Sequence, residues 1–114
     1  MAAEFFNVKK FHAALSSGEP FLIDFFATTC APCKKMAPIF EEFAVLHEDV
    51  HAAKVDVDAE PALAEMCGVR SVPTFILYRN GKEFSRAFGA MPLRKLEQFA
   101  GVKQSCREKE EIFD

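Results

Sequence analysis

The sequence predicts an α/β protein in which a central mixed β-sheet has helices on both faces, and three observations lead to this fold class. Short apolar runs typical of strands alternate with segments of helical periodicity, in an order that begins helix, strand, helix, strand. The strand–helix–strand unit over residues 21–57 predicts parallel strands joined by a right-handed crossover. The pair Asn80-Gly81, between two later strand-like runs, predicts a hairpin that adds antiparallel strands.

The first two predicted elements are a helix and a buried strand. Apolar residues recur at helical spacing between Asn7, a favoured N-cap residue, and Gly18, which ends the helix. The run PFLIDFFA, residues 20–27, is strand-like and apolar on both faces except at Asp24. A strand of this kind is expected at the centre of a sheet that is covered on both sides.

The next two predicted elements complete the crossover unit. From Cys33 onward, apolar residues form a helical stripe. The members of the stripe are Met36, Ile39, Phe40, Phe43 and Leu46. Pro38 removes one helical hydrogen bond, so we expect a kink there without an end to the helix. The alternating run HAAKVDVD, residues 51–58, predicts the second strand.

The remaining elements are two helices and the hairpin. The segment 60–68 predicts a short helix that stops at Gly68. Residues 73–78 and 83–88 are the two hairpin strands. Residues 92–101 predict a last helix, with proline in its first turn.

Composition limits the class of function. A chain of 114 residues, 50% hydrophobic and 27% charged, is typical of one globular domain. A net charge of −3 gives no sign of a nucleic-acid or anionic-membrane partner, because both call for a basic surface. The N-terminal residues lack the apolar core of a signal peptide, and no apolar run is long enough for a membrane span. We therefore expect a cytoplasmic monomer, whose thiols are kept reduced.

The pair Cys30-x-x-Cys33 poses a choice between metal binding, a structural disulfide and redox chemistry. With His47 and His51 it falls within the general spacing of a zinc site. A helix over residues 33–46 would, however, separate Cys33 from His47 by roughly 20 Å. Zinc needs all four ligands at about 2.3 Å or less from one point. Zinc therefore stays a minor alternative, and we expect no metal.

A structural disulfide explains the pair less well than redox chemistry does. A disulfide that closes such a short loop removes little chain entropy. Cys30 instead lies at a strand-to-helix turn, where the helix dipole and unpaired N–H groups stabilise a thiolate. Pro32 stiffens the turn that holds Cys33 nearby. Cys-x-x-Cys beside a strand–helix–strand unit in a cytosolic protein is a redox signature.

Several ordered motifs resemble the thioredoxin family. FLIDFFATTCAPCKKMAPIF, residues 21–40, is similar to the family's strand and active-site helix, with CAPC in place of the usual CGPC. KVDVD, from residue 54, is similar to its next strand. VRSVPTFILYRNGK and FGAMPLRKLEQF, from residues 69 and 88, resemble its cis-proline hairpin and its closing helix. The resemblance implies a thioredoxin fold in a domain over residues 1–101, followed by a charged tail over residues 102–114.

The resemblance also implies catalytic roles. Cys30 would be the attacking nucleophile and Cys33 the resolving thiol, and the two would form the redox-active disulfide. Asp24 matches the family's buried acid and Lys54 the lysine near it. Independently, a carboxylate on a strand apolar on both faces should have a raised pKa, which suits proton transfer to and from Cys33. Lys54 would moderate that shift, and a purely structural role of Asp24 is the alternative.

A substrate groove follows from the same resemblance. Pro73 matches the family's cis-proline, and Val72 would present its backbone to an extended substrate segment. Gly89 and Ala90 would leave room in the groove. The remaining expected substrate contacts are Thr29, Ala31 and Pro32.

Three residues depart from the family pattern. Thr29 and Phe26 stand where the family usually has tryptophan, and Ala31 replaces the usual glycine between the cysteines. Thr29 removes an apolar surface beside Cys30, so we expect altered partner choice more than altered chemistry. Ala31 changes the dipeptide between the cysteines, which predicts an altered redox potential.

Two further cysteines lie outside the motif. Cys67, at the end of a short helix, is expected to be buried and inert. Cys106, in the charged tail, is expected to be exposed, with a regulatory or intermolecular role as an alternative.

These observations predict a thiol–disulfide oxidoreductase that reduces disulfide-containing substrate proteins through a mixed disulfide. No metal or organic cofactor is implied. By resemblance, an NADPH-dependent thioredoxin reductase would regenerate the dithiol. The alternatives are a thioredoxin-like protein-binding module with little catalytic role, and an oxidase or isomerase of an oxidising compartment. The absent signal peptide and the Ala-Pro dipeptide disfavour the latter.

Overall fold

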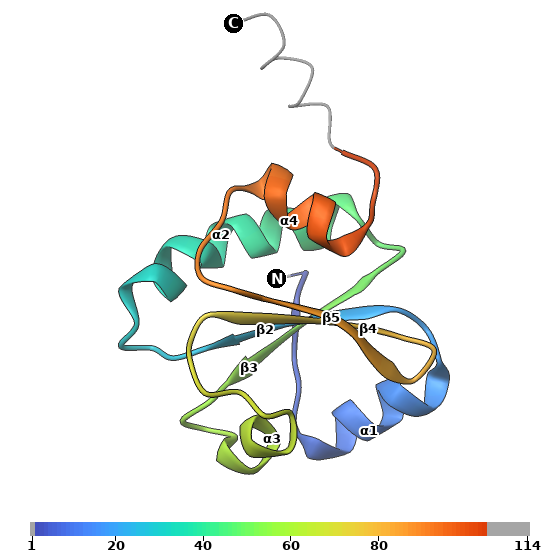
Figure 1. Ribbon diagram of the computed structural model, residues 1–114, viewed down its shortest axis with the longest axis vertical. Helices are drawn as coiled ribbons and strands as arrows, with labels where there is room; N and C mark the ends of the chain where they lie inside the picture. Colours follow the sequence, from blue (N-terminus) through green and yellow to red (C-terminus); the bar gives the residue numbers. More distant parts are fainter. Residues whose placement is uncertain (1, 105–114) are drawn as a thin grey trace, which may run out of the picture.

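In the computed structural model, which describes residues 2–104, helices and strands alternate along the chain (Figure 1). The order follows the expected one after an additional strand at the start. The elements are β1 (Glu4–Phe5), α1 (Val8–Ser17), β2 (Phe21–Phe26), α2 (Ala31–Leu46), β3 (His51–Asp56), α3 (Pro61–Met66), β4 (Thr74–Arg79), β5 (Lys82–Phe88) and α4 (Leu93–Ala100).

The strands form one mixed sheet in the spatial order β1-β3-β2-β4-β5. β2 and β3 are parallel, with Phe21 opposite His51, which confirms the predicted crossover unit. β4 is antiparallel to β2, with Phe75 opposite Asp24. β2 is thus the central strand, paired on both sides, as its apolar pattern predicts.

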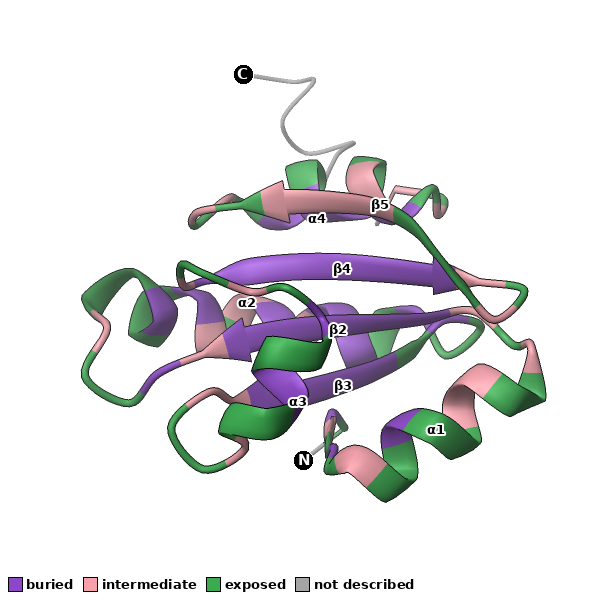
Figure 2. Ribbon diagram, turned by 60° about the horizontal axis from the view of Figure 1, so that its bottom comes forward, coloured by how far each residue is buried: buried purple, intermediate pink, exposed green. Residues whose placement is uncertain are grey.

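Helices cover both faces of the sheet, as expected (Figure 1). α2 and α4 pack on one face and α1 and α3 on the other. The largest fully buried side chains divide between these two layers, and β2 and β4 are the most deeply buried strands (Figure 2). The apolar side chains of β2 point alternately into the two layers, so that Leu22 faces α2 and Ile23 faces α1.

The hairpin between β4 and β5 is confirmed in detail. Asn80 and Gly81 both have positive φ, of 56° and 75°, as a two-residue type I′ turn requires. Arg79 pairs directly with Lys82 across the turn. The Asn-Gly pair therefore sets the register next to the turn, and an irregularity between Leu77 and Tyr78 shifts the register farther along the two strands.

The predicted stripe on α2 is correct except near its end. Met36, Phe40 and Phe43 are fully buried, but Leu46 is 47% exposed. At about 100° per residue, Leu46 lies roughly 80° around the helix from Met36, whereas His47 lies only about 20° away. His47 accordingly takes the buried position at the end of this helix.

The additional strand β1 was not predicted. It pairs in parallel with β3, with Phe5 opposite Lys54. Two residues are too few to produce a recognisable alternation in the sequence. This short edge strand nevertheless brings the N-terminal segment to the layer beneath α2.

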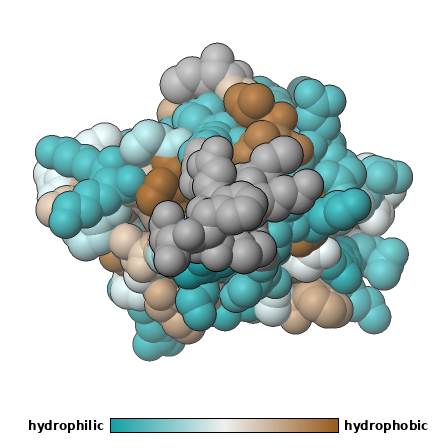
Figure 3. Space-filling model, turned by 90° about the horizontal axis from the view of Figure 1, so that it is seen from above, coloured by the Kyte–Doolittle hydropathy of each residue, from teal (hydrophilic) through white to brown (hydrophobic). Residues whose placement is uncertain are grey.

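The surface over α2 and α4 is largely hydrophilic, with hydrophobic side chains in small separate groups (Figure 3). Val45 and Leu46 of α2 are the exposed large apolar residues of that helix. Over residues 2–104, the helices are too short or too polar to cross a bilayer.

Candidate active site

The two motif cysteines lie where the central strand gives way to a helix. β2 ends at Phe26, and Cys30 is the N-cap of α2, two residues before Pro32 in its first turn. Cys30 and Cys33 are joined by a disulfide, with their Cα atoms 5.2 Å apart. Cys30 is partly exposed, whereas Cys33 is buried at 4% exposure. Access to the pair from outside is therefore through Cys30.

The helix start gives Cys30 a favourable electrostatic setting. Its Sγ accepts a hydrogen bond from the backbone N–H of Cys33 at 3.2 Å. Its carbonyl oxygen accepts the first helical bond from the N–H of Lys34 at 3.1 Å. Because N–H groups and the positive end of the helix dipole face this sulfur, a thiolate at Cys30 would be stabilised.

A second chain segment lies directly beside Cys30. The Val72–Pro73 peptide bond is cis, as the family resemblance implies. The Val72 carbonyl oxygen lies 3.8 Å from Cys30 Sγ. The N–H of Gly89 donates to the Pro73 carbonyl at 2.9 Å. Residues from three distant parts of the sequence thus meet at the disulfide.

The rim of this meeting point is open. Gly89 has φ of +88°, and a Cβ there would have no heavy atom within 4 Å, so this position combines a backbone that favours glycine with open space. The other predicted contact residues on the rim are exposed. They are Thr29, Ala31, Pro32 and Ala90.

Asp24 lies beneath this rim, on the face of β2 that α2 covers. It is 1% exposed, and its Oδ1 has no hydrogen-bond partner among the described residues. Burial raises the pKa of this carboxyl group to about 7, while the positive charge of Lys54 opposes the rise. The raised pKa and its two causes agree with the expectation from the sequence.

Lys54 is held by residues that the sequence analysis did not include. It lies opposite Asp24 on the neighbouring parallel strand. Its Nζ lies 3.8 Å from Glu41 Oε2, and 5.3 Å and 5.2 Å from the ring centroids of Phe5 and Phe26. Glu41 follows Cys33 by eight residues, which places it about 80° around the helix from that cysteine, so the sequence contains no clear signal that Glu41 approaches Lys54.

Cys67 is buried, as expected. Its sulfur accepts a hydrogen bond from the Tyr78 hydroxyl at 3.3 Å. Burial raises the pKa of the Cys67 thiol, and because the thiolate is the reactive form, this disfavours reaction. Cys106 lies outside the described residues.

The two histidines of the zinc alternative make other contacts. His47 Nε2 lies 2.6 Å from Glu97 Oε2, and His51 Nε2 lies 2.9 Å from Glu4 Oε1. Within residues 2–104, the histidine, cysteine and acidic side chains form no group of three or more that could hold a metal.

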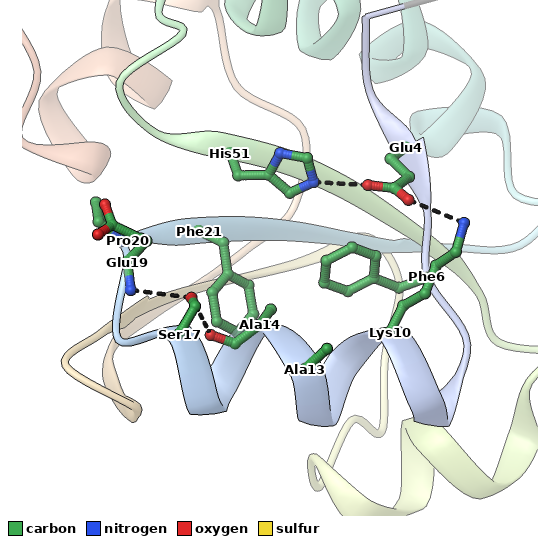
Figure 4. Close-up of a pocket in the computed structure, with 10 residues that line it drawn as sticks. All are labelled: Glu4, Phe6, Lys10, Ala13, Ala14, Ser17, Glu19, Pro20, Phe21 and His51. Carbon is green, nitrogen blue, oxygen red and sulfur yellow. Dashed lines mark hydrogen bonds and ion pairs between the residues drawn. The ribbon is translucent and has the colours of Figure 1, made fainter.

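A separate hollow lies between α1 and the far end of the sheet (Figure 4). Its volume is about 410 Å³, and Phe6 and Phe21 line it. At its rim Glu4 contacts both Lys10 and His51, each at 2.9 Å. Phe21 begins β2, whereas the cysteine pair follows the end of β2, so the hollow and the disulfide lie at opposite ends of that strand.

Comparison with known proteins agrees with this geometry. The thioredoxin family model matches residues 2–101. A thioredoxin of Alicyclobacillus acidocaldarius is 42% identical over 96 residues, which cover 82% of this chain and 91% of that protein. Thioredoxin-2 of Saccharomyces cerevisiae is 41% identical over 106 residues, covering 92% of this chain and 95% of the relative.

Solved structures show the same fold. The thioredoxin of Plasmodium falciparum superposes with a TM-score of 0.81 at 32% identity, covering 87% of this chain and 97% of that one. The oxidised mitochondrial thioredoxin 3 of Saccharomyces cerevisiae superposes with a TM-score of 0.80 at 33% identity, covering 88% of this chain and 94% of that one. The chain therefore belongs to the thioredoxin family of thiol–disulfide oxidoreductases.

Proposed function

We propose that this protein reduces disulfides in other proteins by dithiol–disulfide exchange. The observation that carries the proposal is the partly exposed Cys30 at the start of α2, joined by a disulfide to the buried Cys33. In the reduced protein, a Cys30 thiolate attacks one sulfur of a substrate disulfide. A mixed disulfide forms, and the other substrate sulfur leaves as a thiolate.

The second step releases the substrate. Cys33 loses its proton and attacks Cys30 Sγ, which breaks the mixed disulfide and forms the Cys30–Cys33 disulfide. The second substrate sulfur leaves as a thiolate and takes up a proton. Two electrons have then passed from the protein dithiol to the substrate, and the protein ends in the oxidised form.

Asp24 is the proposed proton acceptor for Cys33. A carboxyl group with a pKa of about 7 exchanges protons readily at neutral pH. Lys54, opposite it on β3, keeps part of the carboxylate ionised. The position of Asp24 on the α2-facing side of the central strand supports this role.

Substrate contacts are proposed for the rim around Cys30. An extended substrate segment would lie along the backbone at Val72 and Pro73, in the manner of an added strand. The open space at Gly89 supports such an approach. Thr29, Ala31, Pro32 and Ala90 would contact the substrate around the sulfur. Because Thr29 is smaller than tryptophan, an altered choice of partners is expected.

An external reductant must return the disulfide to the dithiol. We propose a thioredoxin reductase that draws on NADPH, and a cytoplasmic monomer whose catalytic domain spans residues 1–101 with a tail over residues 102–114. Neither a metal nor an organic cofactor takes part in the proposed exchange.

The test is NADPH-coupled insulin reduction with a supplied thioredoxin reductase. The wild-type chain should consume NADPH in proportion to its concentration, and a Cys30→Ser/Cys33→Ser variant should not. A Cys106→Ser variant serves as the matched control for loss of a cysteine and should retain the rate. If the double variant keeps full biological activity in cells, the protein is a binding module and the proposal is wrong.

A further inference from the structure

The ammonium group of Lys54 is enclosed by side chains from three elements. Phe5 of β1 and Phe26 of β2 place their rings 5.3 Å and 5.2 Å from its Nζ, measured to the ring centroids. Glu41 of α2 places its Oε2 3.8 Å away. Lys54 as a whole is only 8% exposed, so its charge is largely withdrawn from water. A cation in such a setting needs negative or aromatic partners.

The carboxylate of Glu41 serves two groups at once. Its Oε1 accepts hydrogen bonds from the backbone N–H groups of Ala2 at 3.0 Å and Ala3 at 3.2 Å. Its Oε2 faces Lys54 and has no hydrogen-bond partner within the described part of the chain. Residues 2–5, here called the N-terminal strap, therefore reach Lys54 by two routes, through Glu41 and through the Phe5 ring.

We propose that Glu41, held by the N-terminal strap, is a positioning residue that controls how strongly the Lys54 ammonium interacts with Asp24. The inference rests on the proposed function, in which Asp24 accepts the proton of Cys33. Lys54 has two carboxylates within its surroundings, Asp24 on β2 and Glu41 on α2. One cation shared between two anions stabilises each of them less than it would stabilise one alone.

The other residues around Asp24 do not provide a second carboxylate that competes with it for Lys54. α2, which covers this face of the sheet, carries the buried Cys33 in its first turn, and the proposed function makes the Cys33 thiol of the reduced protein the group that exchanges a proton with Asp24. From β4, the residue opposite Asp24 is the uncharged Phe75. Asp56, two residues beyond Lys54 on β3, uses its Oδ1 to accept the N–H of Asp58 at 3.0 Å. Glu41 is thus the carboxylate that competes with Asp24 for the lysine.

The direction in which the pKa of Asp24 should change in each variant follows from this competition. Glu41→Gln keeps an amide oxygen for the N–H groups of the strap but removes the negative charge. The Lys54 ammonium, still enclosed, is then left with Asp24 as its anionic partner. The Asp24 carboxylate is favoured, so its pKa should fall. Lys54→Met removes the cation and should raise the pKa of Asp24, because desolvation then acts unopposed.

The experiment is an NMR titration of the Asp24 carboxyl carbon in the reduced full-length protein. Four proteins are compared: wild type, Glu41→Gln, Lys54→Met and the double variant. We expect Glu41→Gln to lower the midpoint by roughly half a pH unit or more. We expect the double variant to titrate like Lys54→Met alone, because Glu41 acts through the lysine. Glu48→Gln, an exposed glutamate just beyond α2, controls for the change in net charge and should leave the midpoint unchanged.

Two results would overturn the inference. The first is an unchanged or raised midpoint in Glu41→Gln. The second is an equal lowering in the presence and absence of Lys54, which would mean that Glu41 acts directly on Asp24. Should Glu41→Gln fail to fold, Glu41→Asp replaces it. Its shorter carboxylate keeps the charge farther from the lysine, so a smaller shift in the same direction is expected. Insulin reduction by the wild type is scored separately, so a failure of the proposed function is distinguishable from a failure of this inference.

Discussion

His47 Nε2 and Glu97 Oε2 lie 2.6 Å apart and join the end of α2 to the middle of α4. Both side chains are buried, with exposed fractions of 10% and 1%. The contact lies in the layer that also contains Asp24, at the opposite end of α2 from Cys33. It is a polar contact between two helices that also pack through a shared hydrophobic cluster.

Replacing Glu97 should test that link. Glu97→Ala removes the carboxylate that contacts the buried His47, and the loss of a hydrogen-bond partner by a buried polar group costs about 1–3 kcal/mol of unfolding free energy. Urea denaturation followed by circular dichroism measures the loss. Glu48→Ala, at an exposed glutamate next to His47, should change the unfolding free energy by less than about 0.5 kcal/mol. Equal losses in the two variants would contradict a specific role for the pair.

Asp24→Asn should lower the rate of insulin reduction at neutral pH and leave the fold intact. The substitution removes the proton acceptor but keeps the size of the side chain. In the wild type, the rate should rise through about pH 7, where the carboxyl group ionises. The variant should lack this rise. A variant whose turnover equals that of the wild type across pH 6 to 9 would make Asp24 a structural residue only.

The same substitution should make the protein more stable at high pH. The pKa of Asp24 is raised from 3.8 to about 7 on folding, so the folded state holds its proton more tightly than the unfolded state does. Its contribution to stability is therefore full below about pH 4 and is lost as the pH rises to about 7. The advantage of Asp24→Asn should grow over this window to at most on the order of 4 kcal/mol. Urea midpoints at pH 4, 6 and 8 measure it, and a constant difference would contradict the assignment.

Cys33→Ser should trap substrates on Cys30. The partly exposed Cys30 can still attack, but the buried resolving thiol is gone, so the mixed disulfide persists. Incubation with a cell lysate should give covalent adducts that dithiothreitol releases. The Cys30→Ser/Cys33→Ser variant should give none. Adducts carried by Cys33 in a Cys30→Ser protein would reverse the two roles, and adducts that persist in the double variant would point to Cys106.

Sequence patterns were sufficient to predict a residue's environment where that environment depends on the residue's own segment of the chain. Asp24 could be predicted as a buried acid because both faces of its strand are apolar. The hairpin at Asn80-Gly81 could be predicted because few other residues adopt positive φ at both positions of a two-residue turn. The catalytic roles and the cis bond at Pro73 required the family resemblance, because few X-Pro bonds are cis.

The parts that the sequence did not predict depend on contacts between distant segments. β1 has no pattern of its own and exists because β3 offers it a free edge. Leu46 is apolar but exposed, because it points away from the buried face of α2. His47 lies on that face instead, and its ring contacts Glu97 of α4. Glu41 is unremarkable in a helix that also contains Glu42. Its proposed role depends on contacts with Lys54 and with the N–H groups of the N-terminal strap, which lie far away in the sequence.

The central position of β2 in the sheet affects how well the segment that carries the reactive cysteines resists local unfolding. This strand is hydrogen-bonded on both sides and buried on both faces, so its amide protons should exchange with solvent only when the whole domain unfolds. The edge strands β1 and β5 can fray by local opening. Only three residues of chain separate Cys30 from the end of β2, so the reactive cysteine is attached to the strand that should be the last to open.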